Sequence, residues 1–376
     1  MGRKRASDVP HSAGSTMKLL KRNIPACGAT IRGVTLIELM VAITVGLIIL
    51  AAVSQLFVNS RSTYNTEEAL ARVQESGRFA IDFLARDIRM AGYLGCAGTL
   101  ASADIENRSQ DATDDDKFNI VGITGHTYVG AGNSNSAWSP ALPNDLFPGS
   151  GIGQPLPNTD VIVIQYGDNT NIVEAPNNLN AQLKISPQSS VARNISAGSV
   201  LMVTNCDHAD VFRATAVSGG ASQTTISHAA NLNTSPQLSR IYGLESEVIY
   251  IATRAYYIGT GAGGEPSLYV RSSSSVSTEL VSGIETLKAL YGEDQTNDGI
   301  VDTYTTAPTN WRRVIQARIG VLARSPSPLG EVADTSIYNI LAVTNSGTQG
   351  TVDDFDPPDD RRARRVFGTS VRLRNH

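Results

Sequence analysis

The acidic loop at residues 294–302 has the donor spacing in this chain closest to that of a metal site. Asp294, Asp298, Gly299 and Asp302 match the first, fifth, sixth and ninth places of a calcium-binding loop, in which closely spaced oxygens surround a hard cation. The twelfth place is Thr305, which lacks the bidentate carboxylate of such loops. A plain Asp/Asn/Gly turn is therefore favoured, and calcium bound by the three aspartates is the alternative. No other cofactor is predicted.

Other residues with ligand or nucleophile chemistry form no catalytic arrangement. Residues 206–210 (CDHAD) are the densest ligand-like cluster, but none of the five His residues lies in an HxxxH pattern and no CxxC occurs. The segment GTGAGG at 259–264 resembles a phosphate loop, yet a strand pattern follows it where a dinucleotide fold needs a helix, so a hairpin loop is expected. No Ser/His/Asp or Walker motif stands out. The chain is therefore not expected to be an enzyme.

Glu38 is the only charged residue in a long apolar run. Residues 34–58 (VTLIELMVAITVGLIILAAVSQLFV) contain no proline, and about 20 such residues cross a bilayer as a helix. A carboxylate inside such a run is costly unless it is paired, so it indicates a function. Hydration of Glu38 near the membrane surface is the alternative.

Charge is divided unequally along the 376 residues, whose net charge is −4. Residues 1–33 carry seven basic residues and one acidic residue, a net +6, which leaves −10 for the rest. Because the basic residues precede the apolar run, the positive-inside rule places them in the cytoplasm and the body outside. An acidic body argues against direct binding of nucleic acid, which requires a basic face. The ordinary overall composition excludes collagen-like, disulfide-dense and wholly disordered chains.

Two cysteines, Cys96 and Cys206, follow the apolar run, whereas Cys27 precedes it. In an oxidising compartment outside the cytoplasm, such a pair is expected to form a disulfide. The bond would connect two segments of the chain. One is the end of the long helix, which is described in the next paragraph, and the other is a strand pattern at 199–206. Two unpaired buried thiols are the alternative.

Helical periodicity continues beyond the apolar run to about residue 91, where Gly92 supplies a stop. Apolar residues recur at spacings of three and four, namely Leu70, Val73, Gly77, Ile81, Leu84, Ile88 and Ala91. The first half of this helix, 34–58, is predicted to lie in a membrane. The second half, 59–92, is predicted to be amphipathic and to pack on a sheet. A coiled coil is the alternative, although the stripe is short for one.

Residues 93–376 are predicted to form a β-rich globular domain. Residues 100–160 are polar and rich in Gly and Pro, so they are expected to be a loop-rich insert with little regular core. Strand patterns then begin at Val161, Ser199, Val211, Glu247, Ser267, Val314 and Val366. A turn or two of helix is expected at 284–290. The predicted fold class is α+β, with one long N-terminal helix packed on an antiparallel β-sheet.

The string RGVTLIELMVAI at 32–43 resembles the type IV prepilin signal. In that family a membrane peptidase removes the basic leader by cutting after the glycine and then methylates the new N-terminus. The resemblance therefore implies removal of residues 1–33, cleavage between Gly33 and Val34, and N-methylation of Val34. It also implies a pilin-like fold in which residues 34–58 form the filament-core half of the helix. Assembly roles follow for Thr35 and for Glu38, the fifth-position acid, which would pair with the newly exposed α-amino group of a neighbouring subunit and set the axial register. The family usually has Phe at the position of Val34.

The body resembles PilW-type minor pilins of the type IV pilus. The motifs are RDIRMAGYLGC at 86–96, LVSGIETLKALYGEDQTNDGIVD at 280–302, QARIGVLARS at 316–325 and RRVFGTSVRLRN at 364–375. The resemblance implies a low-abundance subunit that helps initiate pilus assembly, lies in the tip complex, and supports twitching motility and adhesion. The implied partners are other minor pilins, the major pilin, the prepilin peptidase, the inner-membrane assembly platform and a large tip adhesin. The implied location is the bacterial inner membrane, with a single span and a periplasmic body, and then the pilus surface.

Two other functions remain open. A type II secretion pseudopilin carries the same signal, although this body is large for one. The polar insert at 100–160 could instead make the chain a surface-binding or DNA-binding adhesin module at the pilus tip. Translation could also start at Met17 rather than Met1, which would give a shorter leader.

Overall fold

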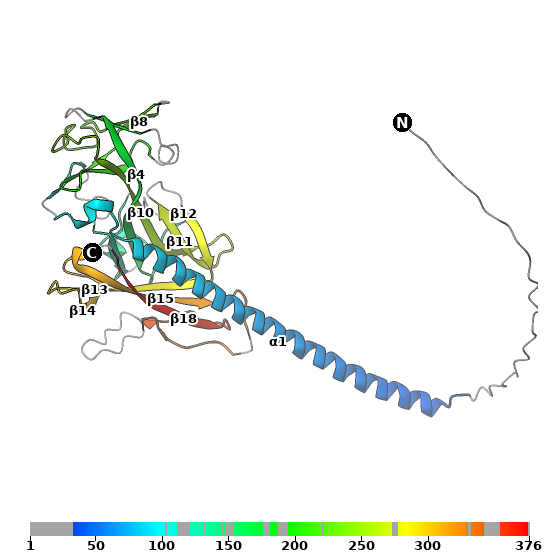
Figure 1. Cartoon of the computed structure of the whole chain (residues 1–376). Helices are drawn as coiled ribbons and strands as arrows, with labels where there is room; N and C mark the ends of the chain where they lie inside the picture. Colours follow the sequence, from blue (N-terminus) through cyan, green and yellow to red (C-terminus); the bar gives the residue numbers. More distant parts are fainter. Residues whose placement is uncertain are drawn as a thin grey trace, which may run out of the picture. The chain divides into compact units, whose positions relative to one another are not determined.

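The computed structural model describes residues 33–101, 104–110, 121–130, 132–144, 146–147, 153–175, 181–186, 195–219, 222–272, 277–329, 332–341 and 354–374. The predicted leader before Gly33 lies outside the described residues. The chain forms two compact units, Met1–Arg61 and Ser62–His376. A single helix, α1 (Leu36–Met90), contributes residues to both units (Figure 1).

The predicted long N-terminal helix is confirmed. The buried residues of α1 are Ala69, Val73, Gly77, Ala80, Leu84, Ala85, Asp87 and Ile88. Gly92 follows the last turn with a φ of 74°, a conformation that costs glycine little and ends the helix. The prediction for Leu70 is wrong, because it is 42% exposed while its neighbour Ala69 is buried. The small Ala69 side chain lies on the side of the helix that faces the body.

The larger sheet has 12 strands among the described residues, with the main order β1-β7-β6-β10-β4-β5-β9-β8. Strand β2 pairs with β4 and with β3, and strand β11 pairs with β10 and with β12. The bounds are β1 (Ile105–Asn107), β2 (Ile123–Tyr128), β3 (Trp138–Ser139), β4 (Val161–Ala175), β5 (Gln182–Ile185), β6 (Val200–Thr204), β7 (Ala209–Arg213), β8 (Ala216–Gly219), β9 (Thr224–Ser227), β10 (Glu247–Thr260), β11 (Pro266–Ser272) and β12 (Ser277–Ser282). The pairings given for these strands are antiparallel except for β1 with β7, which is parallel.

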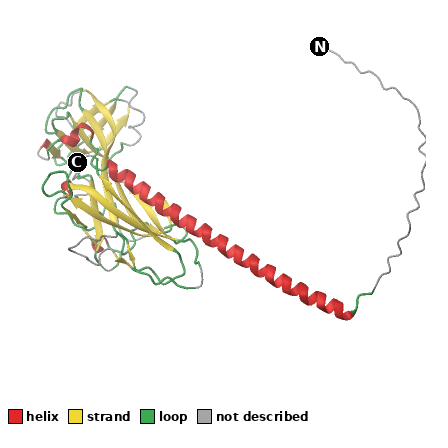
Figure 2. Cartoon of the chain, turned by 60° about the horizontal axis from the view of Figure 1, so that its bottom comes forward, coloured by secondary structure: helices red, strands yellow, loops and turns green. Residues whose placement is uncertain are grey.

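A second sheet packs on the C-terminal half of α1. Its order is β14-β13-β15-β18, from β13 (Ile284–Glu293), β14 (Thr303–Thr305), β15 (Val314–Arg324) and β18 (Arg364–Arg372), while β16 (Tyr338–Asn339) and β17 (Asp354–Phe355) form a separate pair. A Cβ added at Gly77 would lie only 2.1 Å from the ring of Phe367 on β18, so the helix backbone lies very close to the sheet. Figure 2 shows the strands of the body in yellow beside the end of the red helix.

The helix expected at 284–290 is wrong, because these residues form part of β13. Every residue of β13 is buried, and the strand pairs antiparallel with β15 from Ile284 to Glu293. Leu, Lys and Ala in this segment are good helix formers in isolation. Burial between neighbouring strands and α1 overrides that local preference.

The insert at 100–160 is more ordered than expected, so the prediction of little regular core is wrong for its described part. Strand β2 pairs with β4, and a buried cluster gathers around Trp138 with Leu146, Phe147 and Tyr257. The Trp138 indole N–H donates a hydrogen bond to the carbonyl of Thr159 at 2.9 Å. These apolar residues are isolated in a polar sequence, so no periodic pattern signals their burial.

Candidate functional site

The N-terminal end of α1 holds the four predicted processing and register residues next to one another. Thr35 precedes the helix, and its backbone N–H and side-chain hydroxyl donate to Glu38 Oε2 at 3.1 and 3.0 Å. The Glu38 N–H donates in return to the Thr35 hydroxyl at 3.3 Å. This reciprocal pair is a capping box, which satisfies N–H groups that a helix leaves without partners at its start. The sequence contains the signature of this motif, Thr-x-x-Glu before an apolar run. The capping role of the two residues could therefore have been predicted.

Gly33 has no structural reason to be glycine. A Cβ built at this position meets no atom within 4 Å, and its φ lies outside the left-handed region. The neighbouring Val34 is also exposed. A larger side chain at 33 is therefore compatible with the local fold, and a requirement for glycine there must come from outside the folded chain.

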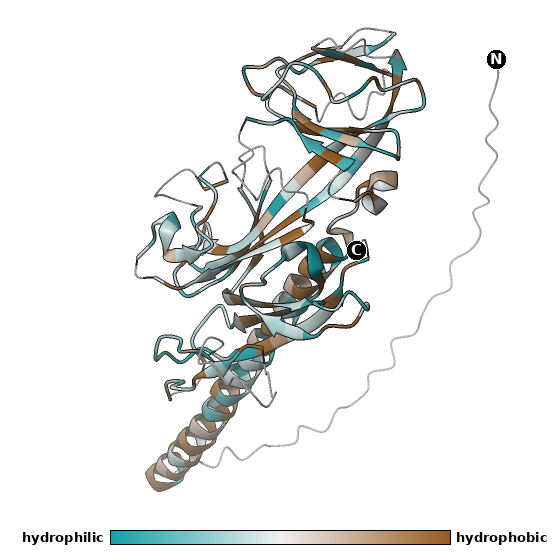
Figure 3. Ribbon diagram, turned by 90° about the vertical axis from the view of Figure 1, so that its left-hand side faces the viewer, coloured by the Kyte–Doolittle hydropathy of each residue, from teal (hydrophilic) through white to brown (hydrophobic). Residues whose placement is uncertain are grey.

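The first half of α1 exposes a continuous apolar surface. Its large apolar side chains between Leu36 and Val58 are each about half exposed or more, and Figure 3 shows the brown, hydrophobic colour along this end of the helix. By length and composition, α1 is able to cross a membrane. Exposed apolar surface of this extent requires lipid or protein to cover it.

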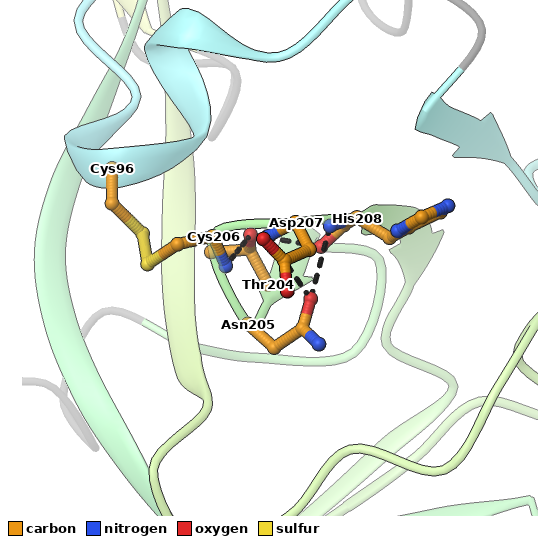
Figure 4. Close-up of a disulfide and its surroundings, with 6 residues drawn as sticks. All are labelled: Cys96, Thr204, Asn205, Cys206, Asp207 and His208. Carbon is orange, nitrogen blue, oxygen red and sulfur yellow. Dashed lines mark hydrogen bonds between the residues drawn. A yellow bond between two sulfur atoms is a disulfide. The ribbon is translucent and has the colours of Figure 1, made fainter.

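The body carries the predicted disulfide between Cys96 and Cys206, which joins residues 110 positions apart (Figure 4). Cys96 lies in the short helix η1 (Gly95–Thr99) just after α1. Cys206 lies in the turn between β6 and β7, with a φ of 68°. The Asn205 side chain accepts the N–H of His208 at 2.9 Å, and Thr204 accepts the N–H of Cys206 at 3.0 Å. Local side chains thus hold the turn that presents Cys206 to the end of the helix.

The loop at 294–302 uses its carboxylates within the chain. Asp294 accepts backbone N–H groups from Asn297, Asp298 and Gly299 at 2.6–3.2 Å. Asp302 accepts the N–H groups of residues 295 and 296. Burial opposes ionisation of Asp294, but these amide bonds prevail and lower its pKa. This is the arrangement of a plain turn.

The other motif-like segments form no metal site. In the part of the chain that the structure describes, no group of three or more His, Cys, Asp or Glu side chains could hold a metal ion. Within residues 206–210, the Cys206 sulfur is bonded to Cys96 and has no thiolate to offer a metal. The glycine-rich segment at 259–264 joins β10 to β11, which confirms the expected hairpin.

Sequence reasoning missed Asp87, which lies off the predicted apolar stripe and yet is buried. Arg254 and Tyr256 of β10 donate hydrogen bonds to Asp87 Oδ2 at 2.7 and 2.5 Å. Burial, and then the charge of Asp87, raise the pKa of Tyr256 far above its usual range, so its hydroxyl stays a donor. Asp87 therefore fixes the end of α1 on the larger sheet. Its partners are 167 and 169 positions away, so no local pattern could have revealed them.

Comparison with known proteins gives two family matches. Residues 255–375 match the family Type IV Pilus-assembly protein W, and residues 29–54 match the prokaryotic N-terminal methylation motif. No curated protein matches the chain. A solved structure, the type IV-like pilin TTHA1219 from Thermus thermophilus, is 11% identical with a TM-score of 0.31, and the match covers 82% of this chain and 96% of that one. A likeness at this level has no bearing on fold or function.

The methylation motif, the long apolar N-terminal helix and the sheet-rich body together support a type IV pilin-like protein. Within that class the C-terminal match supports a PilW-type pilin, in agreement with the body motifs. This identification fits a membrane-anchored pilus subunit with pilus-assembly partners.

Proposed function

We propose that this chain is a minor type IV pilus subunit, present in few copies, that helps to initiate assembly and forms part of the tip complex. The observation that carries the proposal is the exposed apolar half of α1, Leu36–Val58, which begins at a capping box directly after Gly33. Such a surface is suited first to lipid and then to the helices of other subunits in a filament. In this role the protein supports twitching motility and adhesion.

Cleavage after Gly33 and methylation of Val34 are the first steps of this function. The lack of any steric or conformational need for glycine at 33 supports recognition of that residue by a peptidase. Because the capping box begins at Thr35, α1 keeps its own start when residues 1–33 leave. The new α-amino group then lies one residue before the cap.

Glu38 sets the register of the subunit in the filament by pairing with the α-amino group of a neighbouring pilin. Both bonds from Thr35 reach Oε2, and Oε1 makes no hydrogen bond to any residue that the structure describes. The carboxylate can therefore cap its own helix and accept an N–H from another subunit. Pairing of this kind removes the cost of a charge among apolar helices.

The basic leader lies in the cytoplasm and the body in the periplasm before assembly, as the positive-inside rule requires. The disulfide Cys96–Cys206 is compatible with that oxidising compartment. The proposed partners are the prepilin peptidase, the inner-membrane assembly platform, the major pilin, other minor pilins and a large tip adhesin.

Substitution at Gly33 tests the processing step. Gly33→Leu should leave the full-length precursor in the membrane and remove the protein from sheared pili. Gly46→Leu is the matched control, since a Cβ at Gly46 also meets nothing within 4 Å, and it should be processed normally. Normal processing of Gly33→Leu would refute the proposed function.

A further inference from the structure

A buried lysine and a buried aspartate face each other between the two sheets of the body. Lys288 Nζ lies 3.4 Å from Asp160 Oδ1, and their side chains are only 7% and 3% exposed. Lys288 belongs to β13, and Asp160 immediately precedes β4. The backbone N–H of Asp160 donates to the carbonyl of Leu287 at 2.8 Å, so the two segments are held side by side. Neither residue has a role in the proposed pilus function.

Backbone N–H groups also contact the Asp160 carboxylate. The N–H of Ala289 donates to Asp160 Oδ2 at 3.1 Å, and the backbone N–H of Tyr128 donates to the same carboxylate. The Ala289 N–H on Oδ2 is positioned to stabilise negative charge that develops on that oxygen. Burial raises the pKa of Asp160 despite these bonds and the nearby lysine charge, which favours the neutral acid that condensation requires.

The geometry points to an intramolecular isopeptide bond between Lys288 Nζ and Asp160 Cγ, formed by the folded chain itself. A proton passes from the ammonium to the carboxylate, and the amine attacks Cγ. The tetrahedral oxyanion forms on Oδ2, against the N–H of Ala289. Nζ then passes a second proton to Oδ1, which leaves as water. The balance is one ammonium and one carboxylate converted to one amide and one water, with no oxidant or co-reactant.

Burial supplies the driving force for this condensation. Two charges held away from water carry a large desolvation cost, and a neutral amide between the same atoms removes both. Groups fixed in contact react as though at an effective concentration of about 10⁵–10⁸ M. The product would join β13 covalently to the residue before β4. The two sheets would then be linked under the mechanical load that a filament subunit carries.

The intact mass of the full-length chain, purified in detergent and measured after reduction of the disulfide, tests the inference. The chain should be lighter than its sequence by one water molecule, and a digest should contain a branched peptide joining residues 160 and 288. A full sequence mass, with both residues recovered on separate unmodified peptides, overturns the inference and leaves an ion pair. This result does not depend on pilus assembly.

Variants identify the residues involved. Lys288→Arg keeps the charge but has no amine that can form this bond, so its mass should equal that of its sequence. Lys184→Arg, on β5, should keep the loss of water. Any loss of water in Lys288→Arg overturns the assignment of the lysine.

Discussion

At the scale of single residues, Glu38 combines a local role with a proposed intermolecular one. The capping box requires an acceptor at this position, whereas the register role requires a negative charge. Glutamine also serves in capping boxes, so the two roles can be separated experimentally.

Glu38→Gln should therefore retain the start of α1 and lose incorporation into pili. Its amide can accept the bonds from Thr35 but cannot form an ion pair with an α-amino group. The amount in sheared pili should fall at least tenfold, as far as for Glu38→Ala, while the amount in the membrane stays unchanged. Incorporation of Glu38→Gln at the normal level would contradict the register role and leave capping as the only function.

The sequence allows these residue-scale roles to be predicted only where the partners are close in the chain. Thr35 and Glu38 are three residues apart, and their motif is short and complete. Asp87 differs because its hydrogen-bond donors, which stabilise the buried carboxylate, come from β10, far along the chain. The disulfide lies between these cases, since the two cysteines that follow the apolar run leave a single pairing.

At the scale of elements, the contact between α1 and β18 depends on Gly77. Gly77→Ala should destabilise the body by about 1–3 kcal/mol, because the new methyl group would overlap the Phe367 ring and force the helix from the sheet. Thermal unfolding of the purified chain in detergent measures the effect. Gly46→Ala, where a Cβ meets nothing, should leave the melting temperature unchanged. Equal melting temperatures for the two variants would contradict the close packing of α1 on β18.

The disulfide is expected to stabilise the body by restricting the unfolded chain. Replacement of both Cys96 and Cys206 by Ala should cost about 2–4 kcal/mol, given the long loop that the bond closes. Reducing agent should lower the melting temperature of the natural chain and have no effect on the double variant. A natural chain that melts at the same temperature with and without reducing agent would contradict this role.

Elements with a strong local pattern were predictable, and those decided by tertiary contacts were not. The helix was predicted within a few residues because its periodicity persists over many turns. Strand β13 was taken for helix because Leu287, Lys288 and Ala289 favour helix locally, while burial against β15 and α1 decides the outcome. The cluster around Trp138 was missed because its members come from separate short segments.

At the scale of the whole molecule, stability should fall in acid. Burial opposes ionisation of Glu293, but hydrogen bonds from Thr309 and Asn310 prevail and lower its pKa. Burial likewise opposes ionisation of three other carboxyl groups, whose pKa values are nevertheless lowered by arginines or hydrogen bonds, namely Glu265, Asp334 and Asp360. These carboxyl groups bind fewer protons in the folded chain than in the unfolded chain. Their stabilisation is therefore present above the ordinary carboxyl pKa of about 4 and is lost as the pH falls below it.

His228 begins the loss of stability at a higher pH. Burial lowers the pKa of its imidazole below 6.5, so the unfolded chain binds the proton before the folded chain does. Asp160, whose pKa is raised, acts in the opposite direction while its carboxyl is free. The melting temperature should therefore decline below about pH 6.5 and more steeply below about pH 4. A melting temperature that rises steadily from pH 7 to pH 4 would contradict this balance.

The central claim is that the chain is a processed pilin, and the N-terminus of the protein recovered from sheared pili tests it most directly. Mass spectrometry should find a chain that begins at Val34 with one methyl group on the α-amino nitrogen, in an amount far below that of the major pilin. A chain that begins at Met1 or Met17, or one that is absent from pili while abundant in the membrane, would contradict the account.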